Sequence, residues 1–583
     1  MAATRDSQGK VTLRPEQILV AGRHLPDDDT LRRNASDVFW FGGEKTITIP
    51  WHLLGRAIVY ATDTETVERL MVDACRQGYM ILNGSRNERR GVTGYTVGIG
   101  AWGHRGKVEV KAASVWAMEP EEDEPGDVAA ARIQKGLRDT CTRLNEEKCP
   151  FRATGVGYVA SLYRRMHLEP TEDFAEPLPR EVEAICRHAH VGGPILQVRS
   201  SLSPWVSIDR DRAFGTAMME PLPCGKPTRV PLRKNGLERW NPRDLMARTG
   251  FAEATVQIEA GPAVSLLPLL RPHPILGKNM AIYPTGTLRG VWALSELAFL
   301  EQHGQGYVTA IHQAFTFDSR PVLRPIIQKL RKIEKELKSY GIQAKRLEHM
   351  LYGWCSRRNS MHRFASSHGG EGTTVSDLVA PHMLRRLGPD VTLSRMRFQG
   401  KIPGHPLYQV KGSLTGRPPP GTMDRPDRSA WITASNRIAI AKILQTLDPI
   451  LSERRPGDYV GRIYVDGIDI QASPDQIPKL DGCSIRDHGT RMHIYRAGTV
   501  WAERADSSNW HDATGMSIPR NCTENDLRAI LAHDTDPSGG PFAGGRVWLP
   551  SESGNDPRWE PDMVSSPLHL DEEMISALGF TMP

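Results

Sequence analysis

Three short segments carry acidic, basic and aromatic residues at spacings suited to chemistry. In the first, Asp209 stands where an apolar, β-like run ends. In the second, Lys345, His349 and Tyr352 recur at positions i, i+4 and i+7, which places a cation, an imidazole and an aromatic ring on one helical face. In the third, Asp466 and the glycine after it separate two β-branched runs, which predicts a hairpin with Asp466 at its tip.

An acid at a strand end, an acid at a hairpin tip and a cationic helix are what metal-assisted nucleotidyl transfer requires. Two carboxylates can hold two Mg2+ ions roughly 4 Å apart, and these ions stabilise the attacking and leaving oxygens of an in-line displacement. A lysine on a helix neutralises a triphosphate, and an aromatic ring packs against a base or sugar. Each segment alone is more typical of a turn, a cap or a surface helix, so it is their combination that favours this chemistry.

A helical hairpin with a cationic surface is predicted around the second segment. Residues 321–365 hold 11 Lys or Arg against three Glu, the densest basic stretch of the chain. Apolar residues recur at helical spacing from Ile326 to Leu337, residues 339–341 interrupt the pattern, and a second helix follows over roughly 342–354. Such a hairpin is either a solvated surface or a site for phosphate groups.

Length and composition indicate a large globular protein. The chain has 583 residues, which suggests three or four domains at roughly 150 residues each. Apolar residues make up 39% and charged residues 24%, and no apolar run reaches the roughly 18 residues of a membrane span, which excludes a disordered or multi-span membrane protein. The N-terminus lacks a signal-like stretch and the eight cysteines lack metal-type spacing, so we expect a cytoplasmic protein with reduced thiols and no membrane partner.

Charge is distributed unevenly along the chain. The formal net charge is +6, but residues 501–583 hold 14 acidic and 5 basic side chains and therefore carry −9, which leaves +15 on residues 1–500. A basic body with an acidic end favours a polyanionic partner for the body.

The order of the three segments resembles a family B DNA polymerase of the protein-primed phage and plasmid type. In that family the first palm motif reads DxxSLYP, the fingers motif reads KxxxNxxYG and the second palm motif reads YxDTDS. The run from Cys186 to Gly193 resembles the YxGG linker box, and the run from Trp431 to Arg437 resembles the ITAxAR start of the palm helix. The similarity covers roughly residues 130–500.

The resemblance implies an α+β, multi-domain right-hand polymerase with palm, fingers and thumb. It adds a shortened RNase H-like, exonuclease-type N-terminal domain. The implied domains are a truncated exonuclease-like domain (1–170), a linker box with the first part of the palm (171–320), a fingers helical hairpin (321–358), a loop-rich insertion (359–428), a second part of the palm with the catalytic hairpin (429–500) and a thumb with the acidic C-terminus (501–583).

For the metal ligands, the resemblance implies Asp209 and Asp466, which would bind two Mg2+ or Mn2+ ions. The chain departs from the family here, because Ile468 stands where the principal second ligand would lie, so the carboxylate must come from Asp466 or Asp469. Residues three apart on an undistorted strand point to opposite faces, and this favours Asp466. The Asp-Gly pair also resembles the modified motif of primer-independent polymerases from mobile elements; the alternative is an impaired site.

The resemblance assigns further residues to substrate and DNA. Phe214 would exclude ribonucleotides by sterics, and Lys345, with Arg331 or Lys335, would bind triphosphate. His349 replaces the usual Asn and can add charge near pH 6.5. The residues that remain are placed near the nascent base pair (Tyr352, Gly353) or in contact with DNA (Gly192, Gly193, Thr433, Arg437, Arg496), although Arg496 could equally be an ordinary surface charge.

Proofreading is predicted to be absent. Asp63 and Glu65 supply the letters of a DxE exonuclease motif, but residues 64–79 read as an amphipathic helix with an N-terminal cap. Asp139 resembles the last exonuclease acid without its Tyr, and no middle motif lies between. We therefore expect an inactive domain.

The sequence thus predicts a DNA-directed DNA polymerase that adds dNTPs to a 3'-OH or to a protein hydroxyl. Its expected partners are a DNA template with a primer or terminal protein, and the chain is expected to be monomeric and encoded by a phage or mobile element in a bacterial cell. Two alternatives remain open. One is a primer- or template-independent nucleotidyltransferase of the same fold, and the other is a non-catalytic DNA-binding scaffold.

Overall fold

The computed structural model divides into two compact units. Unit 1 comprises Met1–Phe174 and Pro325–Asp424, and unit 2 comprises Ala175–Arg324 and Arg425–Pro583. The structure describes much of 58–116, then 124–146, 155–165, 178–231, 242–259, 267–272, 279–337, 344–355, 425–453 and most of 457–513, with short strands at 18–22, 39–40, 361–366, 391–398, 407–414, 548–550 and 557–559. Among these residues, no helix combines the length and apolarity needed to span a bilayer.

Unit 1 contains a six-stranded mixed sheet in the order β2-β1-β3-β6-β5-β4. Strand β3 runs parallel to β1 and β6, and β4, β5 and β6 form an antiparallel meander. The strands are β1 (Ile18–Gly22), β2 (Phe39–Trp40), β3 (Ile58–Ala61), β4 (Met80–Asn87), β5 (Gly91–Ile99) and β6 (Gly106–Ala112), followed by helices η4 (Ala113–Trp116), α2 (Gly126–Glu146) and α3 (Gly155–Arg165).

The predicted amphipathic helix after residue 64 is confirmed at the positions that the structure describes. Val67, Leu70 and Ala74 are helical and fully buried. Asp63 and Glu65 lie outside the described residues, and Asp139 lies on α2, as expected of a helix-borne acid.

The two helices of the cationic hairpin are also confirmed, as α9 (Arg324–Leu337) and α10 (Ala344–Cys355). They pack within unit 1: α10 lies against α3, and Arg143 of α2 forms an ion pair with Glu336 of α9, with Nε and Oε2 3.0 Å apart. The segment 359–428, for which the sequence predicts loops, instead contains a three-stranded antiparallel sheet of β16 (Met361–Ser366), β18 (Leu407–Leu414) and β17 (Val391–Phe398). Its strand pairs are non-local, so local composition did not reveal them.

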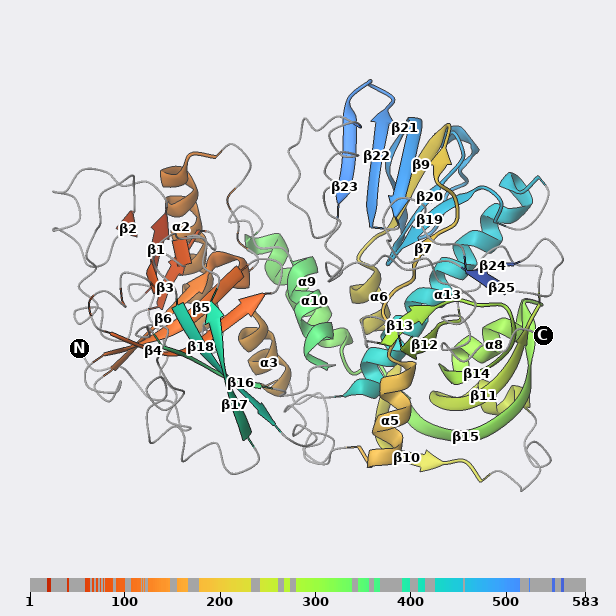
Figure 1. Cartoon of the computed structure of the whole chain (residues 1–583), viewed down its shortest axis with the longest axis horizontal. Coiled ribbons are helices and arrows are strands. Elements are labelled where there is room, and N and C mark those ends of the chain that lie inside the picture. The colour runs from red at the N-terminus through yellow and green to blue at the C-terminus, as the bar shows by residue number, and fades with distance from the viewer. Residues whose placement is uncertain are drawn as a thin grey trace. The chain divides into compact units, whose positions relative to one another are not determined.

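Unit 2 is built around the long helix α13 (Pro426–Leu451), which packs against two sheets and helix α5 (Arg180–Ala189) (Figure 1). A four-stranded antiparallel sheet has the order β10-β15-β11-β14, and helix α8 (Leu294–Gln302) covers one face of it. Its strands are β10 (Leu222–Arg229), β11 (Gly250–Ile258), β14 (Gly286–Ala293) and β15 (Gly306–Arg320), with α7 (Pro242–Met246) and the small pair β12 (Leu269–Pro272) and β13 (Asn279–Ile282) nearby in sequence.

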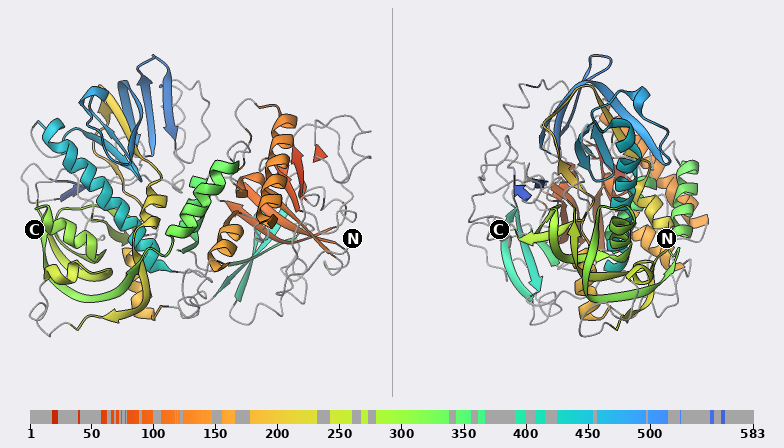
Figure 2. Two further views of the ribbon diagram at one scale, coloured as in Figure 1. Left: turned by 180° about the vertical axis from the view of Figure 1, so that it is seen from behind. Right: turned by 90° about the vertical axis from the view of Figure 1, so that its right-hand side faces the viewer.

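An eight-stranded sheet forms the other half of unit 2, and α13 runs along one of its faces (Figure 2). Its order is β23-β22-β21-β9-β20-β19-β7, and β8 pairs with β21. The strands are β7 (Ile195–Gln197), β8 (Ser201–Leu202), β9 (Trp205–Arg210), β19 (Val460–Tyr464), β20 (Gly467–Ile470), β21 (Cys483–Arg496), β22 (Thr499–Arg504) and β23 (Asn509–Ala513), and a separate two-stranded pair is formed by β24 (Trp548–Pro550) and β25 (Pro557–Trp559).

Candidate active site

Asp209 lies near the end of β9, in the middle of the eight-stranded sheet. Val206 and Ile208 of the same strand are buried in a core shared with Leu444 and Leu447 of α13. Because successive side chains of a strand alternate between faces, Asp209 projects from the face opposite α13. The apolar run that buries β9 therefore also presents the acid at the end of the strand.

The β19–β20 hairpin brings a second acid next to β9. Strand β19 ends at Tyr464 and β20 begins at Gly467, so Asp466 lies at the tip, as the sequence predicts. Gly467 pairs directly with Asp209, and a Cβ atom at Gly467 would lie 3.6 Å from Asp209 Oδ1. The backbone N–H of Arg210 donates to the Asp466 carbonyl at 3.1 Å. The structure therefore brings the Asp209 carboxylate and the hairpin tip together across a residue without a side chain.

The loop after α5 holds the tip of this hairpin. The Val465 N–H donates to the Pro194 carbonyl at 2.7 Å, and Val465 has a φ of 60°, which is costly for a β-branched residue. A Cβ atom at Gly193 would lie only 2.8 Å from Val465 Cα, whereas one at Gly192 would meet nothing within 4 Å. Gly193 thus packs against the hairpin tip, a role that the sequence did not reveal.

Asp469, the other candidate ligand, is placed differently from Asp466. Its carboxylate forms a buried ion pair with Arg462, and each side chain is only 4% exposed. A carboxylate engaged by a buried guanidinium is a poor metal ligand, because leaving the pair would strand the charge of Arg462. We therefore leave Asp469 out of the metal ligands proposed below.

Arg210 and Cys483 flank the two acids and were missed by sequence reasoning. Arg210 Nη1 donates to Asn436 Oδ1 of α13 at 3.0 Å, and burial lowers the pKa of this guanidinium while the Asp466 carboxylate opposes the change. Burial raises the pKa of the Cys483 thiol, which Arg210 lowers in turn. Cys483 is therefore protonated near pH 7. The run Asp-Arg at 209–210 predicts a cation next to the acid in sequence but on the other face of the strand, towards α13.

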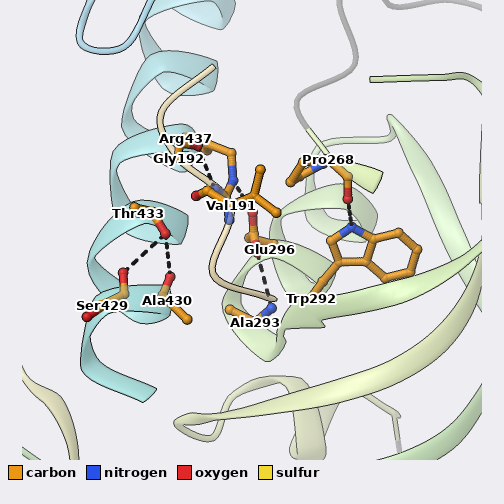
Figure 3. A network of polar contacts seen from close by, with 10 residues as sticks. All are labelled: Val191, Gly192, Pro268, Trp292, Ala293, Glu296, Ser429, Ala430, Thr433 and Arg437. Atoms are coloured by element: carbon orange, nitrogen blue, oxygen red, sulfur yellow. Dashed lines mark hydrogen bonds and ion pairs between the residues drawn. The ribbon is translucent and has the colours of Figure 1, made fainter. Parts of the chain in front are cut away.

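Thr433 and Arg437 of α13 lie inside unit 2, which corrects the DNA contacts expected of them. Figure 3 shows the network that they join. Arg437 is 1% exposed, its Nε lies 2.7 Å from Glu296 Oε1, and its Nη1 donates to the Val191 carbonyl at 2.6 Å. Thr433 is fully buried, and its hydroxyl donates back to the Ala430 carbonyl at 2.9 Å. Arg437 therefore ties α13 to the elements around it, whereas the Thr433 hydrogen bonds stay within α13.

The same network ties the loop after α5 to the core of unit 2. Gly192 accepts a hydrogen bond from Arg437 Nη1 at 3.2 Å, and Glu296 Oε2 accepts one from the Ala293 N–H at 3.1 Å. Trp292, beside Ala293, donates its Nε1–H to the Pro268 carbonyl at 2.8 Å (Figure 3). The loop that packs against the hairpin tip is thereby anchored to a buried charge pair.

The cationic hairpin places its candidate residues on α9 and α10 of unit 1. Arg331 does not fit the triphosphate role expected of it, because its Nε lies 3.0 Å from Oε1 of the buried Glu348. Lys335 is exposed, and Gly353 presents open space where a Cβ atom would lie. Partial burial, and then the charge of Lys345, lower the pKa of His349, so its ring is neutral near pH 7 rather than poised to gain charge near 6.5.

Three more candidate positions have simple placements. Phe214 is half-buried on α6 (Ala213–Met219), the short helix that follows β9. Tyr352 is half-buried on α10. The backbone of Arg496 ends β21 opposite Thr499, and its side chain lies outside the described residues.

The donor chemistry of the two acids fits a hard divalent cation. Mg2+ in proteins is commonly held by one or two carboxylates, with water and substrate phosphates completing its octahedron. Within the part of the chain that the structure describes, no three His, Cys, Asp or Glu side chains gather as a metal-holding group. Asp209 and Asp466 therefore suit an ion that shares its ligands with a substrate.

Comparison with known proteins identifies a similar fold. No protein-family model and no curated protein sequence matches the chain. Phi29 DNA polymerase in an orthorhombic crystal form is similar with a TM-score of 0.54 and 12% identity, over 80% of this chain and 85% of that chain. Its complexes with primer-template DNA and incoming nucleotide, and with single-stranded DNA, give TM-scores of 0.52 and 0.51 at the same identity and coverage.

At 12% identity this similarity supports the fold. It agrees with the predicted mixed α and β, right-hand polymerase architecture at a coarse level, while the domain boundaries and the protein-primed subgroup stay predictions. The chain has a fold similar to that of Phi29 DNA polymerase.

Proposed function

We propose that this protein is a DNA-directed DNA polymerase that adds dNTPs to a 3'-OH or to the hydroxyl of a protein primer. The observation that carries the proposal is the placement of Asp209, directly opposite Gly467 and beside the hairpin tip that bears Asp466, in a chain with a Phi29-like fold. The similar structures include complexes with primer-template DNA, incoming nucleotide and single-stranded DNA, which supports DNA and dNTPs as partners. The basic body of the chain suits such partners.

In this proposal Asp209 and Asp466 bind up to two metal ions, either Mg2+ or Mn2+. The bound metal would stabilise the charge that develops on the attacking and leaving oxygens. Lys345 and Lys335 neutralise the triphosphate, and Phe214 excludes a 2'-hydroxyl by sterics. The protein is proposed to act as a monomer encoded by a phage or mobile element.

Around the incoming nucleotide we assign Tyr352, His349 and Gly353 to the face of α10 that meets it. Because the pKa of His349 is lowered, the neutral imidazole acts as a hydrogen-bonding group in place of the family's Asn. Gly353 leaves room on the helix surface for close approach. Gly193 acts indirectly, by positioning the hairpin tip.

The experiment is primer extension on templated DNA with Mg2+ or Mn2+. Asp209→Asn and Asp466→Asn should each lower the rate at least roughly 100-fold, because each removes a carboxylate proposed to hold the metal that stabilises the developing charge. The matched control is Asp475→Asn, at an exposed position in the short helix η6 (Pro474–Gln476), which should extend primers like the wild type. Full activity in an Asp209→Ala, Asp466→Ala double variant would remove these residues from the mechanism.

Proofreading is proposed to be absent. Asp139 lies on α2, without the Tyr that accompanies the last exonuclease acid in the family that the sequence resembles. A 5'-labelled primer incubated with Mg2+ and no dNTPs should stay intact. Shortening of the primer from its 3' end would contradict the proposal.

A second candidate is initiation without a primer, which the Asp-Gly pair at the hairpin tip favours. The same assay on single-stranded DNA without a primer separates the two, because only a primer-independent enzyme makes product there. Salt-dependent DNA binding with no incorporation under either metal would instead favour a non-catalytic scaffold.

A further inference from the structure

The face of the sheet that carries Asp209 is organised in two rows of directly paired residues. The front row joins Tyr464, Gly467 and Asp209 across β19, β20 and β9. The back row joins Arg462 and Asp469 in the same register, two residues behind the front row. Directly paired residues share a face, and two residues span about 7 Å of strand, so the back row lies immediately behind the candidate active site.

Arg462 connects the two rows. Its guanidinium forms the buried ion pair with Asp469, and its Cζ also lies 5.5 Å from the centroid of the Tyr464 ring. A guanidinium over an aromatic face attracts the ring electrostatically. The position of the Tyr464 ring therefore depends on Arg462, and the position of Arg462 depends on Asp469.

A β-bulge sets the register of Arg462. The pairing of β19 with β20 shifts between Val460 and Arg462, which leaves Gly461 as the extra residue. The Gly461 carbonyl accepts the Val198 N–H at 2.7 Å, and a Cβ atom at Gly461 would lie 2.5 Å from Leu202 Cδ1. The glycine is thus needed where it stands, and the bulge directs the next side chain onto the face of Asp469.

We propose that Arg462 and Asp469 are a positioning pair that holds the Tyr464 ring beside Asp209, across the space that Gly467 leaves open, and that Asp469 does not bind the metal. For its link to activity, this inference rests on the proposed function. The opposing reading is that Asp469 leaves Arg462 and becomes a metal ligand.

A double-mutant cycle separates the two readings. Asp469→Asn leaves the charge of Arg462 buried without a counter-ion, and Arg462→Met leaves the charge of Asp469 buried without one. Each single variant should therefore lose roughly 10–100-fold in kcat/KM. The double variant Arg462→Met, Asp469→Asn has no buried charge. Under the proposal it loses no more activity than the single variants, because both residues act through the position of the Tyr464 ring, and the Mn2+ concentration for half-maximal incorporation matches that of the wild type in all three variants. Additive losses in the double variant, or a raised Mn2+ requirement in Asp469→Asn, would overturn the proposal.

The second readout is independent of activity. In protein labelled with 3-fluorotyrosine, the fluorine signal of Tyr464, assigned with Tyr464→Phe, should move in Asp469→Asn. The matched control is Asp427→Asn, which breaks another buried ion pair, between Asp427 and Arg425 with atoms 2.7 Å apart. It should lower the free energy of unfolding without moving the Tyr464 signal.

Failure of the proposed function can be distinguished from failure of the positioning pair. If the wild type incorporates no nucleotide, the proposed function fails, and the fluorine signal still decides the positioning pair. If the wild type is active but Asp469→Asn leaves the Tyr464 signal unmoved, the positioning pair fails and the proposed function stands.

Discussion

His190, the residue that caps the C-terminal end of α5, makes the stability of the chain depend on pH. Burial, and then the charges of Arg437 and Arg187, lower the pKa of His190 to about 4. The unfolded value is about 6.5, so the folded state binds fewer protons between these values. The contribution of neutral His190 to the free energy of unfolding is therefore fully present above about pH 6.5, and it is lost as the pH falls towards 4.

Urea unfolding measures this effect. When the pH is lowered from about 7.5 to about 5, the His190 shift should lower the wild-type free energy of unfolding by about 2 kcal/mol. His190→Gln removes the titrating group, so its unfolding free energy should fall by less over the same range. Equal losses in the two proteins would contradict the pKa shift.

At the residue scale, the sequence predicted the placements that depend only on residues nearby in the chain. Asp209 and Asp466 could be placed because a strand end and a hairpin turn are local features. The pairing of Asp469 with Arg462 could not, since it depends on the bulge at Gly461. Arg437 was wrongly expected at a DNA surface, because its partner Glu296 is 141 residues away in sequence.

At the element scale, the loop after α5 and the β19–β20 hairpin are in direct contact. A Cβ atom at Gly193 would lie 2.8 Å from the backbone of Val465, so Gly193→Ala must displace the hairpin tip. We expect primer extension to fall at least about tenfold and stability to decrease by roughly 1–3 kcal/mol.

Gly192→Ala is the matched control for this change. A Cβ atom there meets nothing within 4 Å, so the variant should behave like the wild type in extension and in thermal unfolding. Equal effects of the two alanines would show that the contact between the loop and Val465 does not position the tip.

Sequence reasoning recovered the elements with a strong local period. The two cationic helices and the helix after residue 64 are present, and β9 and the β19–β20 hairpin stand where the motifs predicted. The sheet of β16, β17 and β18 was missed, because β18 pairs with β17 across 8 intervening residues and with β16 across 40. The grouping of α9 and α10 with unit 1 was missed for the same reason, since it depends on contacts such as Arg143 with Glu336.

At the scale of the whole molecule, a faint net charge conceals a basic body. The value of +15 on residues 1–500 favours a polyanionic partner, which agrees with the proposed DNA polymerase function. The identity to the Phi29 DNA polymerase structure is only 12%, so the similarity is one of fold and not of matching residues. The specific chemistry therefore depends on the few residues placed around Asp209.

The most direct test of the central claim is single-nucleotide incorporation on four primer-templates that differ only in the first templating base. With Mg2+ or Mn2+, each template should direct addition of its complementary dNTP, and Asp209→Asn should abolish addition on all four. Addition of the same nucleotide whatever the template, or no addition by the wild type, would contradict a DNA-directed DNA polymerase.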